Sequence, residues 1–274
     1  MGFDAYFCSS LRFVQPGRQV HNPFSAMNIL VCLSQVPDTT TKIAFSADNK
    51  SLNKTGVQYI INPYDELALT KALELNEATG GGTVTVIHVG GADAEPVLRK
   101  ALAIGADQAV RIEAEPLDSR QVAAELAAYI QGQSYDLVLT GRESIDYNCG
   151  LVGGMLSQYL DWPLVNVATS IDPTGQAGVL AVSRDMDGGR EKVEVSLPAV
   201  ITCQKELTEP RIPNMRGIMA ARSKPLQVVS PQGIGPDLSL LSHALPPARQ
   251  ACRYFEADQM DALVEALRQQ AKVL

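Results

Sequence analysis

Residues 63–89 read PYDELALTKALELNEATGGGTVTVIHV, and this stretch decides the fold class. A proline at its start, followed by Asp65 and Glu66, is typical of the first turn of a helix, where the macrodipole favours negative charge. Three glycines at 80–82 end the helix, and Thr83–Val89 is rich in β-branched residues. The stretch therefore predicts a helix over Pro63–Thr79 and a buried strand directly after it.

The same alternation continues on both sides of this stretch. Before it, the apolar run Ile29–Leu33 predicts an opening strand. After it the pattern predicts, in order, a helix over Ala94–Ile104, a strand over Gln108–Ile112, a helix over Ser119–Ile130, a strand over Asp136–Thr140 and a helix over Gly150–Leu160. Alternating strands and helices indicate an α/β fold, an open and mainly parallel sheet with helices on both faces.

After Pro163 the chain becomes rich in strand-forming residues. This part is expected to complete the sheet as a meander or edge hairpin. Its predicted strands are Val165–Ile171, Val179–Met186, Lys192–Ser196 and Ala199–Cys203.

The two ends differ from this central pattern. Residues 1–26 show neither a secretory signal nor clear periodicity, so they are interpreted as an extension outside the fold, with Met27 as the functional start. Residues 226–274 contain several prolines before an amphipathic helix predicted over Ala257–Ala271. A loop that long is improbable inside a self-sufficient domain, so 226–274 is expected to be an arm that packs on another chain. The α/β domain is assigned to 27–225.

Composition excludes several classes of protein. The 274 residues carry a net charge of −7 and only 5% aromatic residues, which argues against binding nucleic acid. No apolar run is long enough for a membrane helix. Five scattered cysteines without a CxxC pair, and only three histidines, predict no metal site and a reducing compartment, which we take to be the cytoplasm.

The segment 136–155, DLVLTGRESIDYNCGLVGGM, carries the strongest indication of a binding site. It runs from a strand through a glycine-containing loop into a helix whose first turn has no acidic side chain. Such a helix start suits a phosphate, and the carboxyl end of a parallel strand is where open α/β sheets bind ligands. The alternative is that Gly150, Gly153 and Gly154 only allow close helix packing. Neither GxGxxG nor a P-loop occurs.

No catalytic constellation is present. His88 lies in an apolar strand and is interpreted as a core histidine, while Asp65 and Glu66 are explained by the helix dipole. The sequence lacks GxSxG and HExxH motifs. Residues 204–225 have a local charge of +3, from five basic and two acidic residues, and this reversal within an acidic chain suggests a contact surface.

Eight segments of the sequence together resemble the electron transfer flavoprotein β subunit, in order from Met27 to the C-terminus. They are NILVCLSQVPD (28–38), INPYDELAL (61–69), LRKALAIGAD (98–107), DLVLTGRESID (136–146), LDWP (160–163), DMDGG (185–189), LPAVIT (197–202) and EPRIPNMRGIMAARSKP (209–225).

This resemblance implies an electron carrier, not an enzyme with catalytic residues of its own. It implies a heterodimer with an α subunit that holds most of the electron-carrying FAD. Electrons come from flavin dehydrogenases, often the acyl-CoA dehydrogenases of fatty-acid oxidation, and pass to a membrane quinone reductase. It also implies a structural AMP in this chain, and the loop Pro37–Thr41 lying towards the flavin. The implied AMP contacts are Cys32, Asn62, Pro63, Tyr64, Asp65, Val89, Ser144, Ile145, Asp146, Tyr147, Asn148, Cys149, Gly150, Leu151, Val152, Gly153, Gly154 and Met155.

The family's partner-recognition loop maps onto residues 209–219. Met215 stands where many members present a leucine to the dehydrogenase, and methionine is apolar and adaptable enough to replace it. Arg211, Arg216 and Ile218 complete the expected partner-binding set, with the arginines steering an acidic partner.

The sequence departs from the AMP-binding pattern at two positions. Leu151 and Val152 replace the polar Gln and Thr beside the phosphate, so backbone amides must hold the anion. Val152-Gly153 is similar to electron-bifurcating relatives that bind a second FAD in place of AMP, and Gly153-Gly154 offers room for a diphosphate. Tyr147, however, replaces a small residue of those relatives, and AMP is favoured.

Two other classes remain as alternatives. A stand-alone nucleotide sensor similar to universal stress proteins shares this flavodoxin-like strand-to-helix site and needs no α partner. An ATP pyrophosphatase requires an SGGxDS-like loop after the first strand, where this chain has Ser34-Gln35-Val36-Pro37-Asp38.

Overall fold

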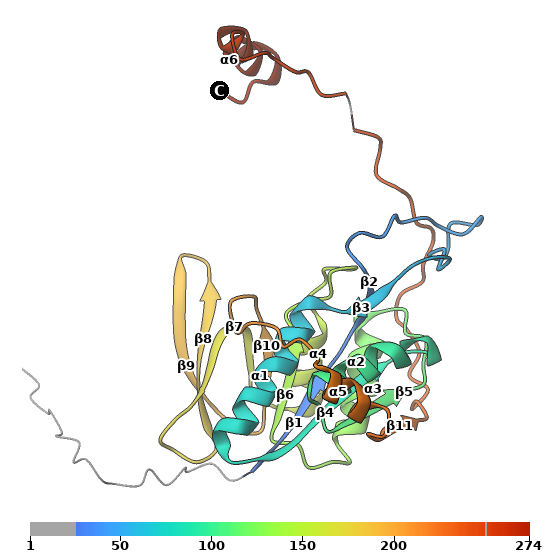
Figure 1. Cartoon of the computed structure of the whole chain (residues 1–274), viewed down its shortest axis with the longest axis vertical. Helices are drawn as coiled ribbons and strands as arrows, with labels where there is room; N and C mark the ends of the chain where they lie inside the picture. Colours follow the sequence, from blue (N-terminus) through green and yellow to red (C-terminus); the bar gives the residue numbers. More distant parts are fainter. Residues whose placement is uncertain (1–25, 250) are drawn as a thin grey trace, which may run out of the picture. The chain divides into compact units, whose positions relative to one another are not determined.

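The computed structural model describes residues 26–249 and 251–274, and its centre is a nine-stranded sheet (Figure 1). The strand order is β11-β5-β4-β1-β6-β10-β7-β8-β9. All neighbours from β11 to β7 pair in parallel, whereas β7, β8 and β9 pair antiparallel. The open, mainly parallel sheet is confirmed. The expectation for residues 1–25 lies outside the described residues.

The structure gives the following bounds. The strands are β1 (Met27–Cys32), β2 (Gln35–Pro37), β3 (Tyr59–Ile61), β4 (Gly82–Val89), β5 (Gln108–Ile112), β6 (Leu137–Gly141), β7 (Leu164–Pro173), β8 (Val179–Met186), β9 (Gly189–Ser196), β10 (Ala199–Cys203) and β11 (Leu226–Val229). The helices are α1 (Pro63–Thr79), α2 (Glu95–Ile104), α3 (Ser119–Ile130), α4 (Val152–Leu160), α5 (Met215–Ala221) and α6 (Met260–Ala266), with short helical turns η1 (Ala92–Ala94) and η2 (Leu267–Ala271).

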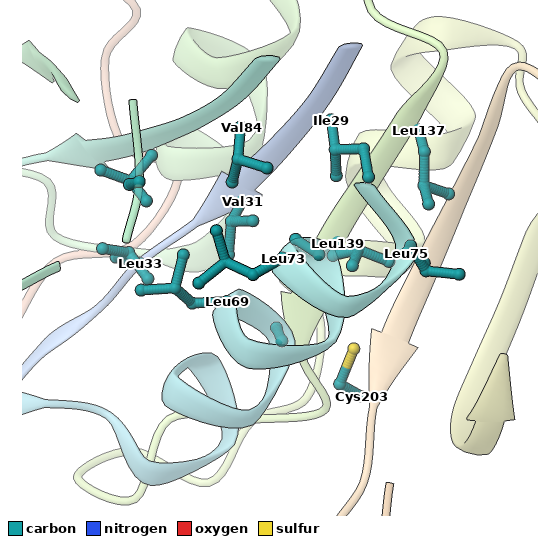
Figure 2. Packing of buried hydrophobic residues seen from close by; sticks show 14 of the residues in the cluster. Ile29, Val31, Leu33, Leu69, Leu73, Leu75, Val84, Leu137, Leu139 and Cys203 are labelled. Atoms are coloured by element: carbon teal, nitrogen blue, oxygen red, sulfur yellow. The ribbon is translucent and has the colours of Figure 1, made fainter. Parts of the chain in front are cut away.

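Helices cover both faces of the sheet, because successive strand residues point to opposite sides. Ile29 and Val31 of β1 pack in one buried cluster with α1 and α2, and Leu30 of the same strand packs in a second cluster with α3 and α4. Figure 2 shows Leu69 and Leu73 of α1 in the first cluster. Strands buried on both faces explain the continuous apolar runs in the sequence.

Two helices begin later than the sequence predicts. The chain enters α2 through the turn η1, so this α-helix starts at Glu95. The helix predicted from Gly150 starts at Val152, because Asn148 and Gly150 have φ angles of 52° and 62° that do not belong to a right-handed helix.

The β-rich part is not a simple meander. The strands β7, β8 and β9 form one, but β10 returns to lie in parallel between β6 and β7. All five residues of β10 are buried, which requires an interior position with both faces covered.

Several elements are absent from the sequence-based prediction. They are the two-stranded antiparallel sheet of β2 and β3, the short helix α5 and the strand β11, which pairs with β5 and carries the main sheet beyond the expected domain end at residue 225. The helix predicted over Ala257–Ala271 is shorter, α6 followed by the π-helical turn η2. Short elements of this kind carry too little periodicity to be recognised.

The described chain divides into two compact units. One holds the sheet and includes Lys54–Leu240, and the other consists of Ala44–Asn53 and Leu241–Leu274. Within residues 26–249 and 251–274, none of the helices combines the length and the apolar character needed to cross a bilayer.

A buried carboxylate joins the first turn of α1 to the ends of two neighbouring strands. Asp65 Oδ2 accepts a hydrogen bond of 2.6 Å from the amide of Ser34, just after β1, and Oδ1 accepts one of 2.8 Å from the amide of Gly141, the last residue of β6. A Cβ at position 141 would lie 2.3 Å from Asp65 Oδ1, so only glycine fits there. Asp65 therefore fixes α1 against the carboxyl ends of β1 and β6.

Burial raises the pKa of Asp65 to about 7, although the amides of Ser34 and Gly141 act in the opposite direction. Between the unfolded value near 3.8 and the folded value near 7, the folded state holds the proton more tightly. The contribution of Asp65 to stability therefore falls as pH rises through this window.

The substitution Asp65→Asn replaces one accepting oxygen by a donor that faces a backbone N–H. We expect a loss of about 1–3 kcal/mol in the free energy of unfolding near pH 5. The loss should be smaller near pH 8, because Asp65 itself contributes less to stability at the higher pH. Urea unfolding at both pH values measures the difference. Equal losses at the two pH values would contradict the assignment of this titration to Asp65.

Candidate nucleotide site

The candidate site lies where the strand order reverses. The chain passes from β1 to β4 on one side and later returns to place β6 on the other side of β1. Helix α1 covers one face at this point and α4 the other. Open α/β sheets bind ligands at the carboxyl ends of strands beside such a reversal. We call this place the β1–β6 edge.

Asn62 organises the loop over the β1–β6 edge. Its side chain is fully buried, and its Nδ2 donates to the carbonyl of Glu143 at 2.8 Å while its Oδ1 accepts from the amide of Ile145 at 3.2 Å. Its own amide donates to the carbonyl of Ser34 at 2.9 Å. One amide side chain thus fixes residues 142–145, the first half of the β6–α4 loop (142–151), relative to the end of β1.

The second half of the β6–α4 loop is exposed and leads to an open helix start. Residues 146–151 are all exposed, with 73% of Tyr147 accessible. No side chain caps the N-terminus of α4, and its first turn has no acidic residue. Met155 is the first residue of α4 whose amide donates a hydrogen bond to the main chain, to the carbonyl of Leu151 at 3.0 Å. The preceding amides and the helix dipole form an arrangement suited to an anion.

The two glycines of the first turn of α4 differ in their surroundings. A Cβ at Gly153 would lie 2.4 Å from Cγ2 of Thr202 on β10 and 3.2 Å from Oγ1 of Thr140 on β6. A Cβ at Gly154 would meet only Leu164, at 4.0 Å. Gly153 therefore allows α4 to pack closely on the sheet, and the open space lies at Gly154.

The other expected site residues take three positions. Cys32 and Val89 end β1 and β4 with buried side chains, and burial raises the pKa of the Cys32 thiol, so this thiol is unreactive. Pro63 and Tyr64 open α1. The remaining residues form the β6–α4 loop and the first turns of α4, namely Ser144, Ile145, Asp146, Tyr147, Asn148, Cys149, Gly150, Leu151, Val152, Gly153, Gly154 and Met155.

Two residues near the site were not expected from the sequence. The guanidinium of Arg142 lies 5.8 Å from the ring centre of Tyr64 and 3.1 Å from the carboxylate of Glu143. Thr202 packs its methyl group towards Gly153 and donates its hydroxyl to Asn166. The contacts of Arg142 with Tyr64 and of Thr202 with Gly153 join positions far apart in the sequence, and only the motifs that contain the two residues, 136–146 and 197–202, could have pointed to them.

His88 has a structural role, and of the four described cysteines Cys32 and Cys203 are buried, whereas Cys149 and Cys252 are exposed. His88 Nδ1 donates to the carbonyl of Leu33 at 2.8 Å, and burial lowers the pKa of His88. Cys32, Cys149, Cys203 and Cys252 are free thiols. Among the described residues, histidine, cysteine and carboxylate side chains form no group that could hold a metal ion.

The expected partner-recognition loop is partly helical. Asn214 caps α5 by accepting from the amide of Gly217 at 2.8 Å, and 73% of Met215 is exposed at the start of the helix. Ile218 is also exposed. Arg211 forms two hydrogen bonds, of 2.7 and 2.8 Å, with the carboxylate of Glu77 on α1. Arg211 therefore anchors the loop, whereas exposed Arg216 forms no ion pair within the described chain.

Comparison with known proteins gives a consistent assignment. Residues 50–233 match the family model described as electron transfer flavoprotein domain. The electron transfer flavoprotein subunit beta of Bacillus subtilis is 36% identical over 262 residues, which cover 90% of this chain and all of that protein. The human protein of the same name is 34% identical over 82% of this chain and 91% of its own length.

A plant relative extends the match. The protein named electron transfer flavoprotein subunit beta, mitochondrial, of Oryza sativa subsp. indica is 33% identical over 90% of this chain and all of its own length. Sequence identity of this level extends over most of the chain, which includes the parallel sheet and the open start of α4 described above. The chain therefore belongs to the electron transfer flavoprotein family, as one of its beta subunits.

Proposed function

We propose that this chain pairs with an α subunit to form an electron transfer flavoprotein, with the electron-carrying FAD held mostly by the α subunit. The heterodimer accepts electrons from flavin dehydrogenases, such as acyl-CoA dehydrogenases of fatty-acid oxidation, and passes them to a quinone reductase. The observation that carries the proposal is the β1–β6 edge, where Asn62 and Asp65 present an ordered loop and an open helix start.

The ligand proposed for the β1–β6 edge is AMP. The amides before Met155 suit its phosphate, and no carboxylate in the first turn of α4 opposes the charge. A side chain at position 153 would point towards Thr202 of the sheet, so the glycine at this position does not enlarge the space for a ligand. The exposed side chain of Tyr147 occupies further space at the loop. Both features favour a monophosphate.

A second FAD, as in an electron-bifurcating relative, is the alternative ligand. The open space at Gly154 is the observation that favours it. This alternative uses the same helix start, with a diphosphate in place of a monophosphate.

The proposed docking surface for a dehydrogenase is α5 together with the preceding loop. Ile212, Met215 and Met219 are each more than two-thirds exposed, an unusual density of large apolar side chains. The pairing of Arg211 with Glu77, and the hydrogen bond from the amide of Arg211 to Thr70 Oγ1 at 3.1 Å, fix this loop on α1. Arg216 is left to attract an acidic partner.

Nucleotide analysis tests the assignment of AMP. The purified heterodimer is denatured, and the released nucleotides are separated and counted per heterodimer. We expect one FAD and one AMP. Two FAD and no AMP would contradict the AMP assignment and favour the bifurcating alternative, and a chain that purifies as a stable homodimer with one nucleotide would favour a stand-alone sensor.

A matched pair of variants tests the position of the nucleotide. Gly153→Ala forces α4 away from Thr202, so we expect loss of most of the bound AMP and about 1–3 kcal/mol of unfolding free energy. Gly154→Ala meets no atom of the chain closer than 4.0 Å, so it is expected to keep its unfolding free energy and serves as the control for stability. Nucleotide content and urea unfolding are measured on both variants. Full AMP content in the Gly153 variant would place the ligand elsewhere.

The role of Met215 is tested by the kinetics of electron uptake from an acyl-CoA dehydrogenase. Truncating an exposed anchor residue typically costs 1–2 kcal/mol of binding, so Met215→Ala is expected to raise the KM for the heterodimer about tenfold. The control is Met186→Ala, a half-exposed methionine on β8. The flavin spectrum should not change in either variant. Equal KM values for the two variants would show that α5 is not the docking surface.

A further inference from the structure

The segment that follows β11 has no regular structure, yet two carboxylates of the α3 region hold it in place. Glu125 is only 1% exposed. Its Oε2 accepts a hydrogen bond of 2.7 Å from the amide of Gln232, and its Oε1 accepts one of 3.1 Å from the amide of Ile234. A buried glutamate is rare unless it is paired, and here both oxygens serve the main chain of a segment distant in sequence.

Asp118 has a double function at the start of α3. Its Oδ1 accepts from the amide of Gln121 at 2.7 Å and so caps the helix. Its Oδ2 accepts from the amides of Asp237 at 2.8 Å and Leu238 at 3.1 Å. Hydrogen bonds from the amide of Gln121, and to a smaller extent from those of Asp237 and Leu238, lower the pKa of Asp118.

An arginine completes the attachment. Arg120 donates to the carbonyl of Gly235 at 2.6 Å and pairs with the carboxylate of Asp237. Together, Asp118, Arg120 and Glu125 contact the segment 232–238 at five main-chain positions. Hydrogen bonds to ionised groups are among the stronger ones, so this segment is restrained although it is neither helix nor strand. We call these three residues the α3 clamp.

Exposed leucines begin where the α3 clamp ends. The amide of Leu238 is the last one that donates to Asp118, and the side chain of this residue is 67% exposed. Leu240, Leu241 and Leu245 follow with exposed fractions of 43%, 82% and 60%. Leu238 and Leu240 end the unit that holds the sheet, and large apolar side chains exposed side by side on an irregular segment are typical of contacts with other chains.

We propose that the α3 clamp is a positioning device for assembly: it fixes Leu238 and Leu240 where they contact the α subunit. This inference rests on the proposed heterodimer, which supplies the occupant, an apolar surface of the second chain. Ordering a free segment on binding costs conformational entropy for every residue that is immobilised. Because the clamp orders 232–238 beforehand, the association retains more of the free energy gained by burying the leucines.

The clamp is tested with a variant that separates the two functions of Asp118. Serine caps a helix about as well as aspartate, so Asp118→Ser keeps α3 capped and removes the oxygen that holds the amides of Asp237 and Leu238. Hydrogen exchange of these two amides is measured in the isolated chain and in the purified heterodimer. The dissociation constant for the α subunit of the same organism is measured by titration. We expect faster exchange in the isolated variant and a dissociation constant about tenfold higher.

A second, matched pair of variants leaves α3 untouched. Asp237→Pro removes the donated N–H, whereas Asp237→Asn keeps that N–H and removes only the ion pair with Arg120. The proline variant should weaken binding of the α subunit more than the asparagine variant does. Nucleotide content should be unchanged in both variants, because Asp237 does not lie at the β1–β6 edge.

The outcomes separate the clamp from the proposed function. If the unmodified chain does not bind the α subunit, the proposed heterodimer is wrong. If it binds, and both Asp118→Ser and Asp237→Pro bind equally well, the clamp does not position the arm. Unchanged amide exchange in Asp118→Ser would likewise overturn the clamp.

Discussion

The structure depends on the hydrogen bonds that Asn62 and Asp65 make at the start of α1. Both side chains are buried, and between them they hold the amides of Ser34, Gly141 and Ile145. A buried polar group without partners is costly, so these residues specify one arrangement of β1, α1 and the β6–α4 loop. The open N-terminus of α4 lies at the end of that loop, and its geometry for binding an anion follows from these contacts.

Much of the fold could be predicted because it repeats one pattern. The Pro63–Thr79 helix and the Gln108–Ile112 strand have the expected bounds, since glycines, prolines and strong periodicity delimit them. The position of β10 could not be predicted, because periodicity describes a strand without naming its neighbours. The helix α5 was missed for a related reason, since seven residues capped by Asn214 carry almost no periodic signal.

The candidate site was predictable in outline and not in its supporting contacts. A strand, a loop and a helix start without acidic residues are visible in 136–155, whereas the contact between Gly153 and Thr202 depends on how α4 meets the sheet. The sequence left open whether Gly153 serves packing or ligand space, and the structure assigns it to packing. Likewise, Arg211 could be recognised as a cation of the loop, but its attachment to Glu77 follows only from the fold.

In the proposed function, the amides that open α4 bind the phosphate of an adenine nucleotide. A crystal structure of the heterodimer purified with its own nucleotides tests it most directly. We expect a phosphate group within hydrogen-bonding distance of the amides of residues 152–154, with Asn62 still holding the β6–α4 loop. A nucleotide bound away from this helix start, or a side chain of the α subunit occupying these amides, would contradict it.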